Sequence, residues 1–436
     1  MTCDTGNLLM RGAKSSPVST SSSYMFQTDP SNARRIMAFD IDEEGHHPAY
    51  IHHLVKYWCA KKLPGHLDIV VSPLFIKKYD DLVSTISSCK RQRVELVPIE
   101  ADDYAKLQSQ RLRILRYFEG WKLFCRYAAK LQANHGLLMY FDFFQLPSVL
   151  STDPPCPFSG IYFRPTFHYH NFANYVPSLQ ERFRASRKQW LLSRVLCHPA
   201  LKNLFCLDPF AVEHIGKYFN TRAKIIHLPD PVQRYTGVEP RIEELRASLG
   251  VKRDRQIFLL FGILDKRKGL HELLKAFPLL PRSTCQKLCV LLVGPVESSQ
   301  RDSVKNHIDK LRRTLPVQII LRDDLILDRD IQPYFHLADV VLATYQHHMG
   351  MSSILVRAAQ ARKPVLASSY GLLGEIVNRR DLGLTIDSTR PQEIARGIRT
   401  FISEECNVAF DPNQALAFAH ENSAEQFAHT LFKYLF

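Results

Sequence analysis

Apolar residues in this chain gather in short blocks, and the segments between them return to an apolar position every third or fourth residue. A short apolar block is typical of a buried strand, and the wider spacing is typical of one face of a helix. The pattern is clearest over residues 257–277, where an apolar block ends at Gly262, a polar loop follows and a helix comes next. One face of that helix carries Leu270, Leu273, Leu274 and Phe277.

Similar blocks repeat through both halves of the chain. In the second half they predict strands at 257–262, 288–294, 317–321, 340–343 and 364–367. In the first half they predict strands at 35–40, 67–71, 94–98, 137–141, 160–163, 203–207 and 224–228, with helices between them, including 49–60 and 103–132. Apolar strands alternating with helices indicate parallel sheets covered on both faces. We therefore expect an α/β protein with two doubly wound domains.

Two loops of the second half have the residues of an anion site. Gly262 and Lys268 follow one predicted strand, and Gly350 to Ser353 follow another. Parallel sheets bind ligands at the carboxyl ends of their strands, and helix N-termini attract phosphate. Gly350 would let the backbone approach a phosphate closely, and Ser352 or Ser353 could cap the helix that follows. The alternative for Lys268 is a solvated lysine in a polar loop.

The order of these motifs carries a family resemblance. Phe261-Gly262 with Lys268-Gly269, then Gly350-Met351-Ser352-Ser353, then Lys363-Pro364 resembles the donor half of a GT-B fold glycosyltransferase. The similarity is to the large family of retaining nucleotide-sugar transferases, glycosyltransferase family 4 or group 1. It covers roughly residue 35 to the C-terminus and is best in the second half.

The resemblance implies a fold and an activity. Two Rossmann-like domains would face each other across a cleft. A sugar would pass from a nucleotide-sugar donor to a glycan or lipid-linked acceptor, such as a polysaccharide, glycolipid or other glycoconjugate. The anomeric configuration would be retained, without a metal or other cofactor.

The resemblance also implies roles for single residues. Lys268 would stabilise charge on the leaving nucleotide, and His168, with His170 as second choice, would point at the donor sugar. Donor contacts would come from the set Gly262, Lys268, Gly350, Met351, Ser352, Ser353, Arg357 and Glu375. Gly45 and His46 would form a loop facing the acceptor and the phosphates. For these histidines the alternative is a solvated loop or core residue.

The chain departs from the family pattern at two positions. Many retaining members carry glutamates where this sequence has Met349 and Arg357. A carboxylate accepts hydrogen bonds from sugar hydroxyls, whereas methionine does not and arginine only donates. A second hypothesis is therefore a GT-B-like binding or scaffold protein without catalysis.

The expected domain organisation has four parts. Residues 1–33 are rich in Ser, Thr, Pro and Gly and predict a disordered tail. Residues 34–232 would form the acceptor-side domain and 233–415 the nucleotide-sugar donor domain. Residues 416–436 would form a C-terminal helix that crosses back to the N-terminal domain.

Composition limits the partners. The formal net charge of +14 allows nucleic acid, an anionic membrane surface or phosphorylated substrates. No nucleic-acid-binding motif occurs, so we do not expect nucleic acid. Residues 103–132 form a basic segment with aromatic residues, typical either of a helix on an anionic membrane or of a core-facing aromatic stripe under a charged surface.

The ten cysteines include no C-x2-C pair, and no apolar run reaches the ~20 residues of a membrane helix. We expect a reduced, cytoplasmic protein, with peripheral attachment at a membrane face as one alternative.

Overall fold

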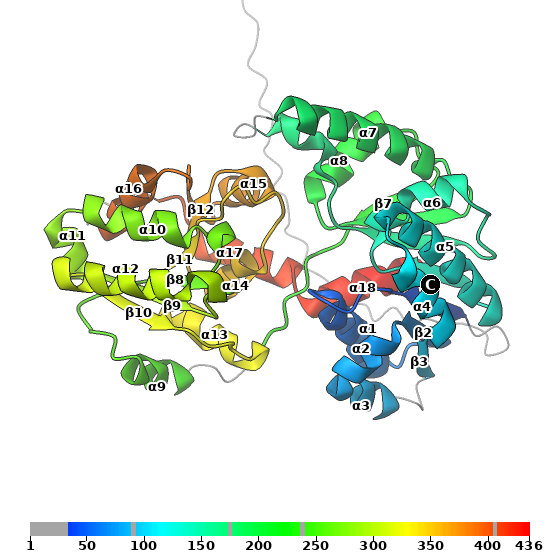
Figure 1. The fold of residues 1–436 in the computed structure, drawn as a ribbon, viewed down its shortest axis with the longest axis horizontal. Coiled ribbons are helices and arrows are strands. Elements are labelled where there is room, and N and C mark those ends of the chain that lie inside the picture. The colour runs from blue at the N-terminus through cyan, green and yellow to red at the C-terminus, as the bar shows by residue number, and fades with distance from the viewer. Residues whose placement is uncertain (1–33, 89–92, 173–176, 236–239, 404–407) are drawn as a thin grey trace, which may run out of the picture.

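The computed structural model describes residues 34–88, 93–172, 177–235, 240–403 and 408–436. Two α/β domains stand side by side and are joined by a linker and by the C-terminal helices (Figure 1). The tail predicted for residues 1–33 lies outside the described residues.

The N-terminal domain is built on a seven-stranded sheet in the order β3-β2-β1-β4-β5-β6-β7. All its strand pairings are parallel. Alternate residues of β1 enter opposite cores: Ile36 lies in one and Met37 in the other. The strands are β1 Arg35–Phe39, β2 His66–Val71, β3 Val94–Pro98, β4 His135–Leu138, β5 Phe158–Tyr162, β6 Leu201–Cys206 and β7 Lys224–His227.

Helices cover both faces of this sheet, as the apolar strands require. They are α1 His47–Lys61, α2 Pro73–Lys78, α3 Asp80–Ser88, α4 Ala101–Ser109, α5 Arg113–Lys130, α6 Gln145–Leu150, α7 Leu179–Leu196 and α8 Pro209–Tyr218. Two 3-10 turns, η3 Phe141–Phe143 and η4 Thr166–Asn171, follow β4 and β5.

The C-terminal domain has a six-stranded parallel sheet in the order β10-β9-β8-β11-β12-β13. The five predicted strands are present, and a sixth, β13, pairs with β12 at the edge. Its sequence Gly-Leu-Thr-Ile is short and only its last residue is buried, so it lacks the apolar block that marks the others. The strands are β8 Gln256–Phe261, β9 Leu288–Val293, β10 Gln318–Arg322, β11 Val340–Ala343, β12 Val365–Ser368 and β13 Gly383–Ile386.

The helices of this half lie around the second sheet, except for the last, which packs on the N-terminal domain (Figure 1). They are α9 Pro240–Ser248, α10 Leu270–Ala276, α11 Arg282–Lys287, α12 Arg301–Thr314, α13 Asp328–Leu337, α14 Ser353–Gln360, α15 Gly371–Arg379, α16 Pro391–Ile402, α17 Pro412–Glu421 and α18 Ala424–Leu435. Three 3-10 turns, η5 Lys266–Lys268, η6 Phe277–Leu279 and η7 Ser298–Gln300, lie among them.

One predicted helix is wrong in extent. Residues 103–132 form two helices, α4 and α5, because Gln110 and Leu112 have extended backbone angles between them. Trp121 and Phe124 of α5 are buried in the core of the N-terminal domain. For these two aromatic side chains, the structure agrees with the alternative of a core-facing aromatic stripe.

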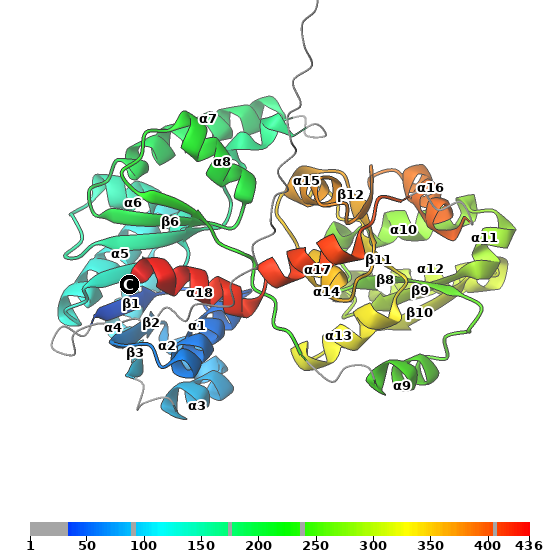
Figure 2. The same ribbon diagram turned by 180° about the vertical axis from the view of Figure 1, so that it is seen from behind.

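The C-terminal segment divides between the domains. Ala415 and Phe418 of α17 belong to the core of the C-terminal domain, whereas Phe427 and Leu431 of α18 belong to the core of the N-terminal domain. Figure 2 shows the two helices end to end across the gap. The crossing element is therefore α18, and α17, which begins before residue 416, completes the C-terminal domain.

Both strand orders reverse direction once. In the first sheet the reversal lies between β1 and β4, and in the second between β8 and β11. Loops leaving the carboxyl ends of two such strands diverge and leave a crevice for a ligand. The loops predicted to carry the site follow β1, β8 and β11, so they lie at these two points.

Candidate functional site

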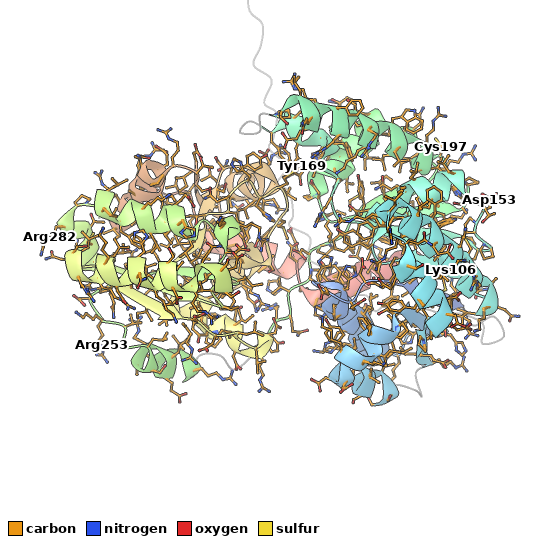
Figure 3. All side chains as sticks on the ribbon, in the orientation of Figure 1. Lys106, Asp153, Tyr169, Cys197, Arg253 and Arg282 are labelled. Carbon is orange, nitrogen blue, oxygen red and sulfur yellow. The ribbon has the colours of Figure 1, made fainter. Side chains whose placement is uncertain are left out.

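A cleft of about 1190 Å³ lies between the domains. Its N-terminal wall includes His46, Tyr140 and Arg164, and its C-terminal wall includes Arg267 and Gly350. Tyr169 also lines it and is labelled in Figure 3 on the side of its domain that faces the other. Two of the predicted loops therefore face each other across one cavity.

The loop after β8 is a tight turn. The carboxylate of Asp265 accepts a hydrogen bond of 3.0 Å from the backbone N–H of Lys268. Gly269 ends the turn with a φ of +74°, a conformation that favours glycine. This turn starts α10 and places Arg267 in the lining of the cleft, whereas the neighbouring Lys268 is not part of that lining.

Lys268 is buried, with 6% of its surface exposed, so its interpretation as a solvated loop lysine is wrong. Its Nζ lies under Gly262, where a Cβ would approach it to 3.0 Å. Nζ donates a hydrogen bond of 2.6 Å to Oη of Tyr345, which in turn lies 2.6 Å from Oγ of Ser352. The ammonium is thus held between the two loops predicted to bind the donor.

Backbone contacts fix these loops to each other. The N–H of Gln346 donates to the carbonyl of Arg267 over 2.8 Å, and Oγ1 of Thr344 donates to the carbonyl of Lys268 over 3.2 Å. A Cβ on Gly269 would lie 2.1 Å from the carbonyl oxygen of Thr344, so only glycine fits this crossing. The positions of both basic side chains are therefore set by the end of β11.

The segment from Gly350 begins α14. Ser352 is its N-cap, since its Oγ accepts a hydrogen bond from the N–H of Ile354. Ser353 is exposed and lines the cleft together with Gly350 and Met351. The start of a helix therefore opens on the cleft, where backbone N–H groups favour an anion.

Arg357 lies one turn further along α14 and is buried. Its Nη2 pairs with Asp328 at the start of α13, and Asp328 also accepts a hydrogen bond of 2.7 Å from Oη of Tyr235. All three residues line the cleft, and Nη1 of Arg357 has no hydrogen-bond partner. A carboxylate is therefore present at this end of the cleft, although it comes from α13 rather than from α14.

The loop after β1 forms part of the opposite wall. Gly45 has a φ of +69°, and no atom lies within 4 Å of the position that a Cβ would take, so space is open above it. His46 packs between aromatic rings, with its centroid 4.5 Å from that of Phe163 and 5.9 Å from that of Tyr140. Burial, assisted by the charges of His47 and Arg164, lowers the pKa of His46 to about 4. His46 is therefore a neutral ring at pH 7.

His47, the next residue, fixes this loop through a buried contact with Asp40. Its Nδ1 lies 2.7 Å from Oδ2 of Asp40, and both side chains are buried. Burial alone would lower the pKa of His47, but the hydrogen bond that its ring donates to the carboxylate of Asp40, together with that negative charge, raises the pKa overall. The pair anchors the start of α1 to the end of β1.

His168 does not line the cleft. Its side chain is 2% exposed, and its Nε2 lies 3.0 Å from Oδ2 of Asp208 without hydrogen-bond geometry. Burial lowers the pKa of His168 to about 3 and raises that of Asp208 to about 7. The neighbouring η4 residues Thr166 and Tyr169 reach the cleft instead. The catalytic assignment of His168 stays a prediction.

Glu375 also lies outside the cleft lining. It forms an ion pair of 2.6 Å with Arg379 one turn along α15. The guanidinium of Arg379 lies 4.4 Å from the ring centroid of Phe210 in the N-terminal domain. Glu375 thus supports a contact between the domains, and its donor contact stays a prediction.

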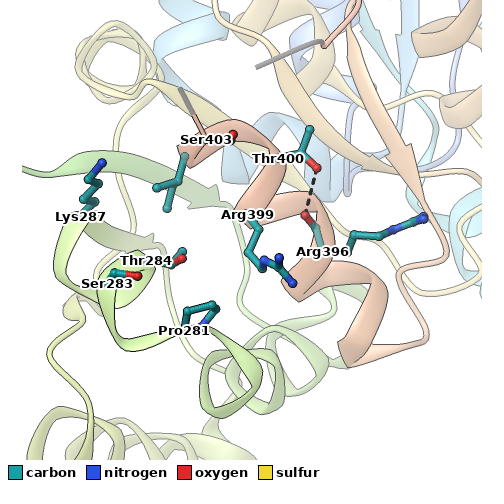
Figure 4. Close-up of a pocket in the computed structure, with 9 residues that line it drawn as sticks. Pro281, Ser283, Thr284, Lys287, Arg396, Arg399, Thr400 and Ser403 are labelled. Atoms are coloured by element: carbon teal, nitrogen blue, oxygen red, sulfur yellow. Dashed lines mark hydrogen bonds between the residues drawn. The ribbon is translucent and has the colours of Figure 1, made fainter. Parts of the chain in front are cut away.

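Other hollows lie away from this cleft. One, between α11 and α16 of the C-terminal domain, is lined by Lys287, Arg396 and Arg399 (Figure 4). Within the described ranges, no three His, Cys, Asp or Glu side chains converge as metal ligands. None of the described helices is long and apolar enough to cross a membrane. The metal independence implied by the resemblance stays a prediction.

Several cleft residues were missed by sequence reasoning. Arg267 adjoins Lys268, so its position was a usable signal. Asp328 and Arg164 follow no motif, because their place in the cleft depends on how distant strand ends meet.

Comparisons with known proteins agree with this geometry. The family model described as glycosyl transferases group 1 matches residues 241–419. The putative glycosyltransferase YtcC of Bacillus subtilis is 27% identical over 167 residues, covering 37% of this chain and 40% of that protein. The D-inositol 3-phosphate glycosyltransferase of Corynebacterium urealyticum is 25% identical over 204 residues, covering 45% and 47%. The chain thus spans less than half the length of these curated relatives.

Solved structures match over both domains. Anabaena Alr3699/HepE in complex with UDP and glucose superposes with a TM-score of 0.57 at 15% identity, covering 92% of this chain and 99% of that one. Sucrose-phosphate synthase of Thermosynechococcus elongatus gives a TM-score of 0.62 at 15% identity, covering 92% and 98%. Residues 241–419 of this chain are therefore similar to the glycosyl transferases group 1, and the two domains together have the GT-B fold.

Proposed function

We propose that this protein is a glycosyltransferase that moves a sugar from a nucleotide-sugar donor to a glycan or lipid-linked acceptor. The observation that carries the proposal is the joining of Lys268 and Arg267 to the start of α14 at the reversal point of the second sheet. A diphosphate in the cleft would meet Arg267 and the N-terminus of a helix, with the buried ammonium of Lys268 adding its charge nearby. The name of one solved neighbour, in complex with UDP and glucose, supports a nucleotide-sugar donor.

The reaction breaks the bond between the sugar C1 and the diphosphate oxygen and forms a bond from C1 to an acceptor oxygen. Negative charge grows on the diphosphate as the bond breaks, so fixed cations stabilise the transition state more than the ground state. In this proposal, Lys268 and Arg267 supply that positive charge. The acceptor hydroxyl loses its proton as the new bond forms, and the departing phosphate oxygen is a base able to take it.

Retention of configuration without a metal is part of the proposal. The carboxylates that line the cleft are Asp230 and Asp328. Asp230 accepts a hydrogen bond of 2.7 Å from Tyr50, and Asp328 is held by Arg357 and Tyr235. Both carboxylates are already engaged by neighbouring side chains, which favours a reaction driven by stabilising the leaving group over one through a covalent sugar intermediate.

The direct test uses the purified chain with UDP, GDP and ADP and with glucose and N-acetylglucosamine donors of each base. We expect one base to raise the melting temperature and its sugar nucleotide to be slowly hydrolysed. Binding without any turnover in the presence of candidate acceptors would favour the rival, a GT-B-like protein without catalysis. Absence of binding to every nucleotide would overturn the donor site.

A peripheral contact with an anionic membrane is a further part of this proposal. Leu112 and Leu115 at the start of α5 are exposed beside Arg111 and Arg113. Apolar side chains next to cations suit an anionic lipid surface. Flotation with anionic liposomes should decrease with salt and be absent with neutral liposomes; equal binding to both would exclude it.

A further inference from the structure

The N-terminal wall of the cleft carries a pair of cations that the donor site does not use. Arg164 follows β5 and Lys188 lies on α7, and both line the cleft. Arg164 is exposed, and no described carboxylate lies within ion-pair distance of it. An unpaired cation at the edge of a cavity is ready to meet an anionic ligand.

Lys188 is held in place by its neighbours. Its Nζ donates to Oγ1 of Thr166 over 2.8 Å and to the carbonyl of Arg164 over 3.3 Å. An ammonium has three protons, so one remains for a ligand. Burial and the charges of Arg164, Arg187 and Arg184 lower the pKa of Lys188, although the charge of Asp142 opposes this. An incoming anion would therefore relieve repulsion among cations.

Arg164 is also fixed from behind. The buried carboxylate of Asp142 accepts hydrogen bonds from the N–H groups of Phe163 (2.8 Å) and Arg164 (3.0 Å). Burial raises the pKa of Asp142 to about 6, and the neighbouring Lys188 and Arg164 charges act in the opposite direction. The backbone at Arg164 is thus held in position by the buried carboxylate of Asp142.

The cleft continues past these residues. A second hollow of about 810 Å³ runs along α7 and shares Thr166, Lys188 and Met349 with the cleft. Arg182 and Arg184 line it as well. Lys188 therefore stands where two basic cavities meet, on the wall opposite Arg267.

We propose that the acceptor of this enzyme carries a phosphate group, which Arg164 and Lys188 bind on the N-terminal wall of the cleft. This inference rests on the proposed transferase function, because it takes the same cleft as the place where donor and acceptor meet. The donor diphosphate belongs to the wall of Arg267 and Lys268. The phosphate can belong to a small phosphomonoester or to a lipid headgroup, since both present the same oxygens to these cations.

The test compares Arg164→Gln and Lys188→Gln with Arg253→Gln, which removes an exposed arginine outside the cleft. Calorimetry measures binding of glucose 6-phosphate and of glucose to each protein. Flotation measures binding to phosphatidylcholine vesicles with and without phosphatidic acid. We expect both cleft variants to bind phosphate at least ~10-fold more weakly than the wild type, as for loss of a charge-assisted contact. The control should bind phosphate as the wild type does. Should Lys188→Gln not fold, the exposed Arg164→Gln decides.

The outcomes separate the sources. Loss of glucose 6-phosphate binding in the cleft variants identifies a small phosphorylated acceptor. Loss of binding to phosphatidic acid vesicles, without binding of glucose 6-phosphate to any protein, identifies a lipid phosphate. Wild-type-like behaviour of both variants overturns the proposal, and so does an equal loss of nucleoside diphosphate affinity, because the cations would then serve the donor. Failure of the wild type to bind any nucleoside diphosphate would instead remove the proposed function.

Discussion

The role proposed for Lys268 depends on its environment more than on its residue type. Buried under Gly262 and bonded to Tyr345, it keeps one fixed position beside the start of α14. A lysine free in solvent would lose rotamer entropy when it binds a phosphate, whereas this one has already been ordered by folding. Its contribution to donor binding should therefore be large for a single ammonium.

We expect Lys268→Met to weaken nucleoside diphosphate binding by ~10- to 100-fold, the range of a hydrogen bond to a charged group. Transfer should fall further, because charge on the leaving phosphate grows toward the transition state. Methionine fills much of the same volume, so loss of the Tyr345 hydrogen bond should cost only about 1 kcal/mol of stability.

The matched control is Lys266→Met, which removes an exposed lysine of the same turn. Calorimetry on folded protein should find the control close to wild type. Equal affinities for Lys268→Met and wild type would remove Lys268 from the donor site and support the scaffold hypothesis.

His135 gives a prediction about pH. It is 2% exposed, its Nε2 lies 2.8 Å from Oγ of Ser159, and burial lowers its pKa to about 4. The unfolded chain takes up a proton near pH 6.5, but the folded chain does not until about pH 4. The stability from this neutral ring is complete above pH 6.5 and is lost as pH falls toward 4, at up to about 1.4 kcal/mol per pH unit.

His135→Gln should therefore lower overall stability at pH 7 and make the fall in unfolding free energy between pH 6.5 and 5 less steep. Urea titrations at both pH values measure this. His420→Gln, at an exposed position, should keep the wild-type slope. An unchanged slope in His135→Gln would mean that this histidine titrates normally in the folded protein.

At the scale of elements, the crossing of the two loops proposed to bind the donor depends on Gly269. Its φ is +74°, and a Cβ would lie 2.1 Å from the carbonyl oxygen of Thr344. Gly269→Ala should destabilise the C-terminal domain by roughly 3 kcal/mol, from the left-handed conformation and the clash together. Gly250→Ala is the control: its φ is +64°, but no atom lies within 4 Å of its Cβ position, so it should cost about 1 kcal/mol. Calorimetric melting measures the loss of stability in each variant. Equal losses would show that the loop shifts to relieve the clash with Thr344.

The elements also show what a sequence can predict. Strands such as β8 and β9 were predictable because a buried parallel strand is apolar at nearly every position. The edge strand β13 and the break between α4 and α5 were not, since each depends on neighbours distant in the chain. The site divides similarly. The cap at Ser352 is a local feature, whereas the burial of Lys268 depends on Tyr345, 77 residues away.

At the scale of the whole molecule, two crossings hold the domains together. The N–H of Val232 in the linker donates to the carbonyl of Asn422 over 3.1 Å, and the N–H of Ala424 returns to the carbonyl of Val232 over 3.2 Å. The linker and the entry to α18 therefore run side by side (Figure 2). Any change in the width of the cleft must move both of these chain segments. Because the second segment leads into α18, the relative position of the domains is linked to the packing of α18 in the core of the N-terminal domain.

Leu431 of α18 tests how far that core depends on the end of the chain. It is fully buried with Trp58 and Phe432 in the N-terminal domain. Leu431→Ala should lower the unfolding free energy of this domain by about 2–5 kcal/mol, as for other buried leucines, and Lys433→Ala at an exposed position should change it little.

The three tryptophans, Trp58, Trp121 and Trp190, all lie in this domain, so their fluorescence during urea unfolding reports on it alone. We expect Leu431→Ala to move the fluorescence transition to lower urea and to leave the melting of the C-terminal domain, seen by calorimetry with bound nucleotide, in place. A fluorescence transition that stays at the wild-type urea concentration would show that the N-terminal domain folds without the support of α18.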